Sequence, residues 1–167
     1  TTNTGTIDPL PEVGRIARRV GAHYHIDAAY GGALIFSERY RDRLAGLGMA
    51  DSVTIDPHKW LFQPFSLGAL FVRNGRHLNA SFRIEPGYLR KDLEIEPDRL
   101  DFYHYSVEGS RSFRGLKLWF TLKTLGRRGL GSLVDRTLDV AHYLDGEVRR
   151  QECFEPFESI VELASVC

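Results

Sequence analysis

The apolar residues near the start of the chain recur every three or four positions, as on one face of an α-helix. Asp8 precedes this segment as an expected N-cap, Pro9 suits the first helical position, and Gly21 suits the end. The pattern predicts a helix over residues 10–20. Its apolar face is formed by Leu10, Val13, Ile16, Ala17 and Val20.

Strands are predicted after this helix over residues 22–27, 52–55 and 67–72, the last of them a compact apolar run. The last run is apolar enough for a strand in a sheet covered on both faces. Residues 40–47, between the first two strands, are predicted as a short helix. Alternation of strands and helices is typical of a layered α/β fold.

The second half of the chain is predicted to be mainly helical. Phe113, Leu116 and Phe120 mark a helix that ends near Gly126. A longer apolar repeat marks a second helix, which could bridge to another domain; it comprises Leu130, Leu133, Val134, Leu138, Ala141 and Val148. Residues 160–167 are predicted as a strand.

Two side chains with distinctive chemistry follow the first two predicted strands. Asp27 lies in His25-Ile-Asp-Ala-Ala-Tyr-Gly-Gly32, and about thirty residues later Lys59 lies in Asp56-Pro-His-Lys-Trp-Leu61. A lysine amine condenses with an aldehyde cofactor to form a Schiff base, which an incoming amino acid displaces. A carboxylate beside a pyridine nitrogen keeps that nitrogen protonated, so that the ring can accept electrons from the substrate Cα. The pair points to pyridoxal 5′-phosphate.

The charge on Asp27 is large enough to decide the protonation of such a ring. Opposite charges about 4 Å apart, at an effective dielectric constant near 20, attract by about 4 kcal/mol, or about three pKa units. Simpler interpretations exist for both residues, because Asp27 could cap the next segment and a lone lysine is usually solvated. Lys59 departs from that rule by its bulky neighbours, Trp60 and Phe62 among them.

The segments 25–32 and 51–61 resemble the central motifs of the group II pyridoxal-phosphate-dependent amino acid decarboxylases, the aromatic-L-amino-acid decarboxylase family. The similarity continues through Pro86-Gly-Tyr-Leu-Arg90 and residues 110–120, so it covers most of the chain. It implies an α/β fold of the fold-type-I transferase-like kind, with a mixed, mainly parallel sheet and flanking helices. Residues 1–125 would belong to the large, cofactor-binding domain, and residues 126–167 would form a connecting helix and the start of a small C-terminal α+β domain.

The resemblance also implies roles for individual residues around the cofactor ring. Lys59 corresponds to the Schiff-base lysine and Asp27 to the partner of the pyridine nitrogen. Ala29, expected on the same strand as Asp27, corresponds to a small residue against one face of the ring. Thr2 corresponds, by its distance from Asp27, to a threonine that contacts the cofactor in relatives. His25 could orient the Asp27 carboxylate.

His58 and Asp56, which precede the lysine, correspond to groups near the cofactor phosphate in relatives. Some relatives have asparagine where this chain has Asp56. A carboxylate would repel a phosphate dianion unless it turned away or engaged a donor of its own. The phosphate-binding role of Asp56 is therefore the weaker of the two.

Tyr88 bears on the reaction and not on cofactor binding. In the animal aromatic decarboxylases a tyrosine on a mobile loop is assigned the protonation of Cα after carbon dioxide leaves, and its spacing to a following arginine matches that from Tyr88 to Arg111. The resemblance therefore implies an active-site flap within residues 73–110. Relatives with phenylalanine at this position tend to release an aldehyde, so the hydroxyl favours formation of the amine. The alternative is a tyrosine on a polar surface loop.

Composition restricts the partners of the chain. Its 22 Lys and Arg balance 22 Asp and Glu, which argues against nucleic acid or an anionic membrane as a partner. Two cysteines make no disulfide framework, and neither an apolar run long enough to cross a membrane nor a signal-like segment is present, so a cytoplasmic location is expected. His23 and His25 lack the companions of a metal site. The partners implied by the resemblance are a small amino acid substrate and, in the full-length enzyme, a second subunit of a homodimer.

The chain is expected to be a fragment, because it starts within a motif at Thr1 and ends in a predicted strand. Relatives supply the phosphate-cradling backbone and a ring-stacking histidine from a segment upstream, so this chain alone is expected to bind the cofactor poorly or not at all. The leading prediction is decarboxylation of an aromatic L-amino acid to the amine and CO2, with glutamate, diaminobutyrate and histidine left open. An aldehyde-forming relative and a non-catalytic remnant are the alternatives.

Overall fold

The computed structural model describes residues 1–83, 101–156 and 160–166. The chain divides into two compact units, one made of residues 1–71 and 114–167 and the other of residues 72–113. The first unit contains the sheet and both residues of the predicted catalytic pair. The predicted boundary between a large domain, residues 1–125, and the segment 126–167 stays a prediction.

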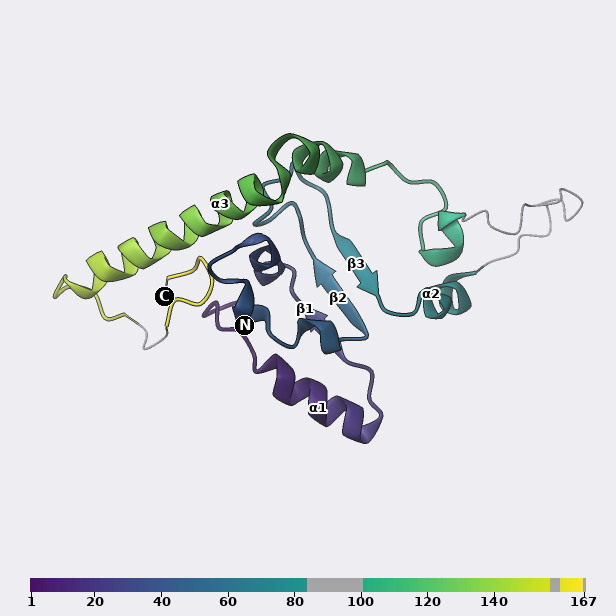
Figure 1. Ribbon diagram of the computed structural model, residues 1–167, viewed down its shortest axis with the longest axis horizontal. Coiled ribbons are helices and arrows are strands. Elements are labelled where there is room, and N and C mark those ends of the chain that lie inside the picture. The colour runs from purple at the N-terminus through teal and green to yellow at the C-terminus, as the bar shows by residue number, and fades with distance from the viewer. Residues whose placement is uncertain (84–100, 157–159, 167) are drawn as a thin grey trace, which may run out of the picture. The chain divides into compact units, whose positions relative to one another are not determined.

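The sheet has three strands in the order β1, β2, β3 (Figure 1). They are β1 (His25–Asp27), β2 (Ser52–Ile55) and β3 (Ala69–Val72). β1 and β2 are parallel, with His25 opposite Ser52 and Asp27 opposite Thr54. The bounds of β2 are those predicted, whereas β1 and β3 begin later than predicted because pairing is restricted to the ends of their apolar runs.

Helix α1 (Leu10–Val20) has the predicted bounds, and Gly21 ends it in the left-handed conformation with φ of 68°. The expected cap is wrong: Pro9 occupies the N-cap position, and no side chain caps the helix. Of the predicted face only Leu10 and Ala17 are buried, and Gly14, outside that face, is buried as well. Ile16 is 52% exposed and Val20 67%, because the sheet that α1 covers is short.

The helix predicted over residues 40–47 is not formed. The structure has 3₁₀ turns there instead, η2 (Arg41–Leu44) and η3 (Leu47–Met49), after an earlier one, η1 (Gly31–Phe36). Gly46 separates η2 from η3 with φ of 92°, and a Cβ on Gly46 would lie 2.7 Å from the backbone nitrogen of Pro11. The chain breaks at Gly46, where it comes close to α1, and so no continuous helix forms. Apolar spacing alone could not reveal this contact.

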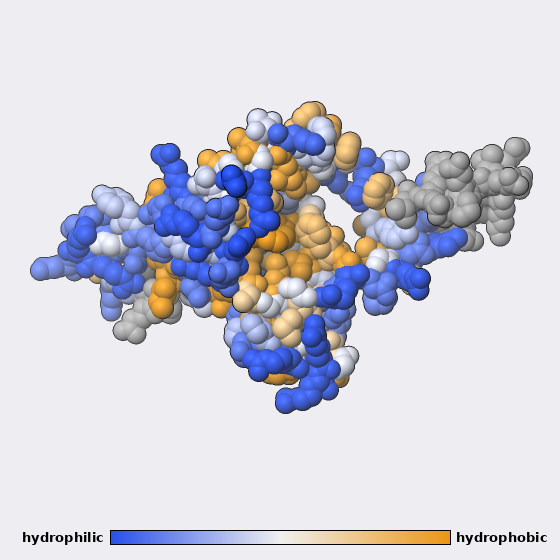
Figure 2. Space-filling model, in the orientation of Figure 1, coloured by the Kyte–Doolittle hydropathy of each residue, from blue (hydrophilic) through white to orange (hydrophobic). Residues whose placement is uncertain are grey.

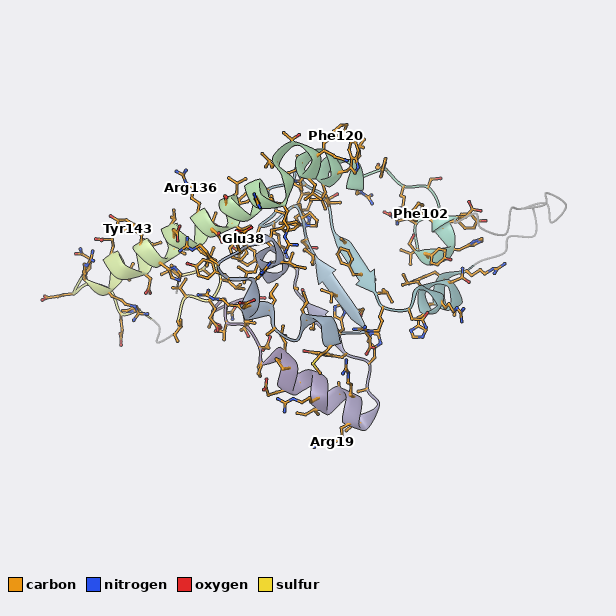
Figure 3. The ribbon with its side chains drawn as sticks, viewed as in Figure 1. Arg19, Glu38, Phe102, Phe120, Arg136 and Tyr143 are labelled. Atoms are coloured by element: carbon orange, nitrogen blue, oxygen red, sulfur yellow. The ribbon has the colours of Figure 1, made fainter. Side chains whose placement is uncertain are left out.

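Helix α3 (Gly115–Arg149) consists of two helical segments, as predicted. Gly126 interrupts it with φ of 65° and ψ of 179°, a conformation that only glycine adopts readily. The segment after Gly126 buries Leu130, Val134 and Leu138 completely, in a core that also contains Leu34 and Trp60. On the same segment Arg136 and Tyr143 are exposed (Figure 3).

The second segment of α3 approaches the end of η1 at Gly131. A Cβ built on Gly131 would overlap the carbonyl oxygen of Phe36 and lie 3.1 Å from its carbonyl carbon. The neighbouring Ser37 is fully buried, and its hydroxyl donates to Asp135 at 2.5 Å and accepts from the backbone N–H of Tyr40 at 2.8 Å. The contact of Gly131 with the Phe36 backbone and the hydrogen bond between Ser37 and Asp135 together fix the place where α3 meets the end of η1.

Gly131→Ala is therefore expected to destabilise the chain, although alanine favours a helix by about 1 kcal/mol over glycine. Forcing the helix away from Phe36 should cost about 1–3 kcal/mol of unfolding free energy, measured by urea denaturation. The matched control is Gly146→Ala on the same helix, where an added Cβ meets nothing within 4 Å; it should stabilise the chain. Equal stabilisation by both alanines would show that the Phe36 contact relaxes without cost.

The predicted strand at the C-terminus is wrong for the residues that the structure describes, 160–166, which have no regular secondary structure. Val161 and Leu163 are buried, but their backbone is held by side chains and not by a neighbouring strand. The hydroxyl of Tyr30 donates to Ala164 O at 3.2 Å, and His142 Nε2 lies 3.1 Å from Val161 O. Burial raises the pKa of Tyr30, so its hydroxyl stays protonated and keeps donating to a higher pH than a solvated tyrosine would.

β3 is less covered than predicted. Leu70 is 54% exposed and Phe71 57%, and Figure 2 shows apolar residues gathered over the sheet. An apolar sequence predicts that the faces of a strand are buried. It does not show whether the residues that bury them belong to the same chain. No helix in the described ranges is long and apolar enough to cross a membrane.

The second unit contains α2 (Gly75–Phe82) and the 3₁₀ turn η4 (Phe102–Tyr105). Asn74 caps α2 by accepting from the backbone N–H of Arg76 at 3.1 Å. The Arg111 guanidinium lies 5.3 Å from the centre of the Phe102 ring, which Figure 3 labels. Residues 84–100, with Tyr88 among them, lie outside the described residues, so the predicted flap stays a prediction.

Candidate functional site

Asp27 is the last residue of β1 and its side chain is exposed. Its Oδ1 accepts a hydrogen bond from the backbone N–H of Ala29 at 3.0 Å, while the N–H of Ala28 donates to Thr54 O at 3.0 Å. The chain thus turns directly after Asp27. The expectation that Ala29 continues the same strand is wrong, because β1 ends at Asp27 and the Ala29 N–H turns back to the Asp27 carboxylate.

Lys59 lies in the turn that follows β2. Its backbone N–H donates to Asp56 O at 2.9 Å, and its Nζ forms an ion pair with Asp56 Oδ2 at 2.9 Å. The N–H of Asp56 donates to Ala29 O at 3.0 Å, so the turn after β1 and the turn after β2 are joined through their backbones. Asp27 and Lys59 therefore follow the carboxyl ends of adjacent parallel strands, where α/β sheets place their ligands.

The lysine turn, defined here as residues 56–67, is held by side chains of α3. Trp60 Nε1 donates to Thr137 Oγ1 at 2.5 Å. The buried Gln63 donates through Nε2 to Thr121 Oγ1 at 3.0 Å. Lys117 Nζ donates to Pro64 O at 2.9 Å. These anchors were not predicted, because nothing in the sequence shows that polar residues between 53 and 77 positions away meet this turn.

The bulky neighbours of Lys59 have a structural explanation. Trp60 and Leu61 are each only 3% exposed, and the Trp60 ring stacks on Tyr30 with centroids 4.8 Å apart. The Lys59 side chain, by contrast, remains 44% exposed. Trp60 and Leu61 bury one side of the turn, whereas Phe62 is 47% exposed and the lysine stays accessible, so the expectation that bulky neighbours keep Lys59 from solvent is wrong.

His58 takes part in closing the lysine turn. Its Nδ1 lies 2.6 Å from Leu67 O and 3.1 Å from Leu67 N, and its ring meets the edge of Phe65 with centroids 4.7 Å apart. Thr2 is exposed in the N-terminal turn. The expected contacts of His58 and Thr2 with a cofactor stay predictions.

His25 does not hold Asp27 in the manner expected. Its Nδ1 lies 2.8 Å from Ser52 Oγ, and its Nε2 lies 3.4 Å from Thr54 Oγ1. His23 Nε2 is also 2.9 Å from Ser52 Oγ. Both imidazoles thus bind hydroxyls of β2, and across the described parts of the chain no group of three or more potential metal ligands occurs.

The side chains at this edge of the sheet suit an aldehyde cofactor with a basic ring nitrogen. Lys59 offers an accessible amine, Asp27 offers an exposed carboxylate, and the half-buried Ala29 between the two turns has no bulk that would exclude a flat ring. An amine for the aldehyde and an anion for the ring nitrogen are the two groups that pyridoxal 5′-phosphate requires of a protein.

Comparison with known proteins decides the family. The model of the pyridoxal-dependent decarboxylase conserved domain matches residues 1–167. The chain belongs to this family of pyridoxal-phosphate-dependent lyases. The predicted resemblance is thereby confirmed.

Among curated relatives, this decarboxylase-family chain is 34% identical to the aromatic-L-amino-acid decarboxylase of Bos taurus over 167 residues, which are 100% of the chain and 34% of the relative. It is 38% identical to the L-2,4-diaminobutyrate decarboxylase of Rhizobium meliloti (strain 1021) over 152 residues, 91% of the chain and 30% of the relative. The chain spans about a third of the length of the curated relatives it matches.

Solved structures of the family share the fold. The structure of Oryza sativa TDC with PLP and tryptamine has a TM-score of 0.90 and 31% identity, covering 99% of this chain and 34% of the other. The structure of Rhodiola rosea 4-hydroxyphenylacetaldehyde synthase has a TM-score of 0.82 and 25% identity, covering 99% of this chain and 32% of the other. The expected similarity to fold-type-I decarboxylases is confirmed, as a small sheet with flanking helices.

Proposed function

We propose that the chain is the lysine-bearing part of an enzyme that decarboxylates an L-amino acid, an aromatic one in the first place, to the amine and CO2. The observation that supports this most is the placement of Lys59 and Asp27 after the carboxyl ends of adjacent parallel strands, in a chain whose whole length matches the family model.

Each residue has a defined task in this proposal. Lys59 would hold the cofactor through its amine, which a substrate amine could replace. Asp27 would supply the negative charge for the ring nitrogen, and Ala29 would leave room for the ring. The cofactor, when bound, supplies a sink for the electron pair released as the α-carboxylate departs. His58, Asp56 and Thr2 are assigned to its periphery, the first two near the phosphate.

The aromatic substrate is supported by the bovine relative and by the rice structure with tryptamine. A basic substrate has specific support as well, because the diaminobutyrate decarboxylase is 38% identical. We assign residues 1–125 to the large domain and residues 126–167 to the connecting helix and the start of the small domain of a homodimeric enzyme located in the cytoplasm.

The proposal is tested by adding pyridoxal 5′-phosphate to a full-length family member that carries this chain, reducing with borohydride and mapping the modified peptide. Modification of Lys59, and not of the exposed Lys123, is expected. A polypeptide carrying this chain within a full-length family member is then given tyrosine, tryptophan, glutamate, diaminobutyrate and histidine in turn, and CO2 and amine are measured. Selective labelling without any decarboxylation would identify the chain as a non-catalytic remnant. The absence of selective labelling from the full-length protein would refute the proposal.

The second candidate function is aldehyde formation, which the structural match to the 4-hydroxyphenylacetaldehyde synthase favours. It consumes oxygen and releases ammonia, whereas plain decarboxylation does neither. Oxygen uptake and ammonia release during turnover therefore separate the two.

Tyr88→Phe is expected to keep cofactor binding and to shift the product from the amine toward the carbonyl compound. The phenol is proposed to protonate Cα after carbon dioxide leaves, and phenylalanine preserves the ring but has no proton to give. Product ratios by chromatography, with oxygen uptake in parallel, check this. Tyr143→Phe, at a tyrosine 70% exposed on α3, is the control. An unaltered amine yield in Tyr88→Phe would remove Tyr88 from the mechanism.

A further inference from the structure

Asp56 and Lys59 form an ion pair within a single turn of the chain. Asp56 Oδ2 lies 2.9 Å from Lys59 Nζ, and the side chains are 19% and 44% exposed. The backbone N–H of Lys59 also donates to Asp56 O at 2.9 Å. The backbone bond fixes the turn and thereby keeps the two side chains within reach of each other.

Asp56 is also held from two other directions. Its N–H donates to Ala29 O at 3.0 Å, and Gly68 leaves room for its carboxylate, since a Cβ at Gly68 would lie 3.2 Å from Asp56 Oδ1. The carboxylate thus occupies a defined place beside the lysine. This arrangement also supplies the donor that a carboxylate near a phosphate needs, because the donor is the Lys59 ammonium itself.

We propose that Asp56 is a positioning residue that holds Lys59 as a paired ammonium and slows its reaction with aldehydes. An ammonium has no lone pair, so Lys59 must leave the carboxylate and give one proton to water before its nitrogen attacks the carbonyl carbon. The carbonyl oxygen then departs as water, and the net reaction releases one proton and one water. This inference rests on the proposed function only for the identity of the natural aldehyde, because the ion pair is seen in the structure itself.

The test compares lysines within the same molecule. The protein is treated with formaldehyde and cyanoborohydride, which methylate free amines without needing a cofactor site, and methylation of Lys59 is divided by that of the exposed Lys123. Asp56→Asn should raise this ratio about threefold at low ionic strength, within the range of an exposed ion pair. In 1 M NaCl, where the Debye length is about 3 Å, the difference from the parent chain should shrink.

Two variants separate the ion pair from a structural effect. Asp56→Glu keeps a carboxylate and should return the ratio toward that of the parent chain. Asp145→Asn is the matched control, because Asp145 pairs with Arg149 at 2.9 Å and is 21% exposed; it should leave the ratio unchanged. If Asp56→Asn unfolds, the parent chain still tests the proposal, since its own ratio should rise with salt. A ratio that responds neither to Asp56→Asn nor to salt overturns the proposal.

A second reaction separates this inference from the proposed function. The same substitutions, made in a full-length family member that carries this chain, are labelled with pyridoxal 5′-phosphate and borohydride. If Asp56→Asn raises methylation while pyridoxal 5′-phosphate labels Lys59 selectively in no variant, the role of Asp56 is supported and the proposed function fails. If both reagents label Lys59 equally fast with and without the carboxylate, Asp56 does not restrain the lysine.

Discussion

Lys59→Ala is expected to abolish covalent cofactor binding and to reduce amine formation to background, in a polypeptide that carries this chain within the full family length. No other common side chain can condense with the cofactor aldehyde and then be displaced by a substrate amine. The visible absorbance of the cofactor-treated protein and the yield of CO2 measure the two effects. Folding should be retained, because the lysine is 44% exposed and its ion pair with Asp56 is worth at most about 1 kcal/mol.

Two further substitutions show whether the amine itself is responsible. Lys59→Arg keeps a positive charge that can pair with Asp56, but a guanidinium stays protonated and does not condense; it should be as inactive as alanine. Lys123→Ala removes an exposed amine of α3 and should leave binding and turnover intact. Covalent binding that survives in Lys59→Ala would assign the cofactor to another lysine.

The sequence was most informative where one local cause determined the structure. α1 has its predicted bounds because Gly21 can adopt the left-handed conformation that ends it. The break at Gly126 was predicted because glycine can adopt the conformation found there. In both cases the residue type permits the local geometry without help from distant parts of the chain.

Errors arose where distant contacts decide. The 3₁₀ turns replace a predicted helix because Gly46 meets Pro11 of α1. Residues 160–166 bury Val161 and Leu163 at the alternation of a strand, yet their carbonyls accept from the side chains of Tyr30 and His142. Hydrophobic spacing predicts which side of a segment is buried, but it does not identify the partner of its backbone.

The candidate site shows the same division. Asp27 and Lys59 could be predicted because each follows an apolar run and carries distinctive chemistry, and the structure places them after adjacent parallel strands. The ion pair of Lys59 with Asp56 could also have been found, since residues three apart in a turn are neighbours. The anchors Thr121 and Thr137 carried no such signal, because they meet Gln63 and Trp60 only through the fold.

Asp27→Asn is expected to leave covalent binding at Lys59 intact and to reduce turnover of a full-length enzyme by about two to three orders of magnitude. The substitution removes the charge alone, because an asparagine Oδ1 can still accept the hydrogen bond that Asp27 Oδ1 accepts from Ala29. A charge about 4 Å from the ring nitrogen contributes about 4 kcal/mol at an effective dielectric constant near 20, but only about 1 kcal/mol in bulk water. The loss should therefore appear in kcat, with borohydride labelling of Lys59 unchanged.

The exposure of Asp27 in this chain makes the size of that loss informative. Asp27 is exposed here, so the larger value requires parts of the enzyme beyond this chain to exclude water from the carboxylate. A reduction of only about fivefold would indicate a solvated carboxylate, as in the present structure. Asp27→Ala removes both the charge and the hydrogen bond from the Ala29 N–H. Any further loss of activity relative to Asp27→Asn therefore measures the contribution of the turn that this hydrogen bond holds. Full turnover in Asp27→Asn would exclude Asp27 as the partner of the ring nitrogen.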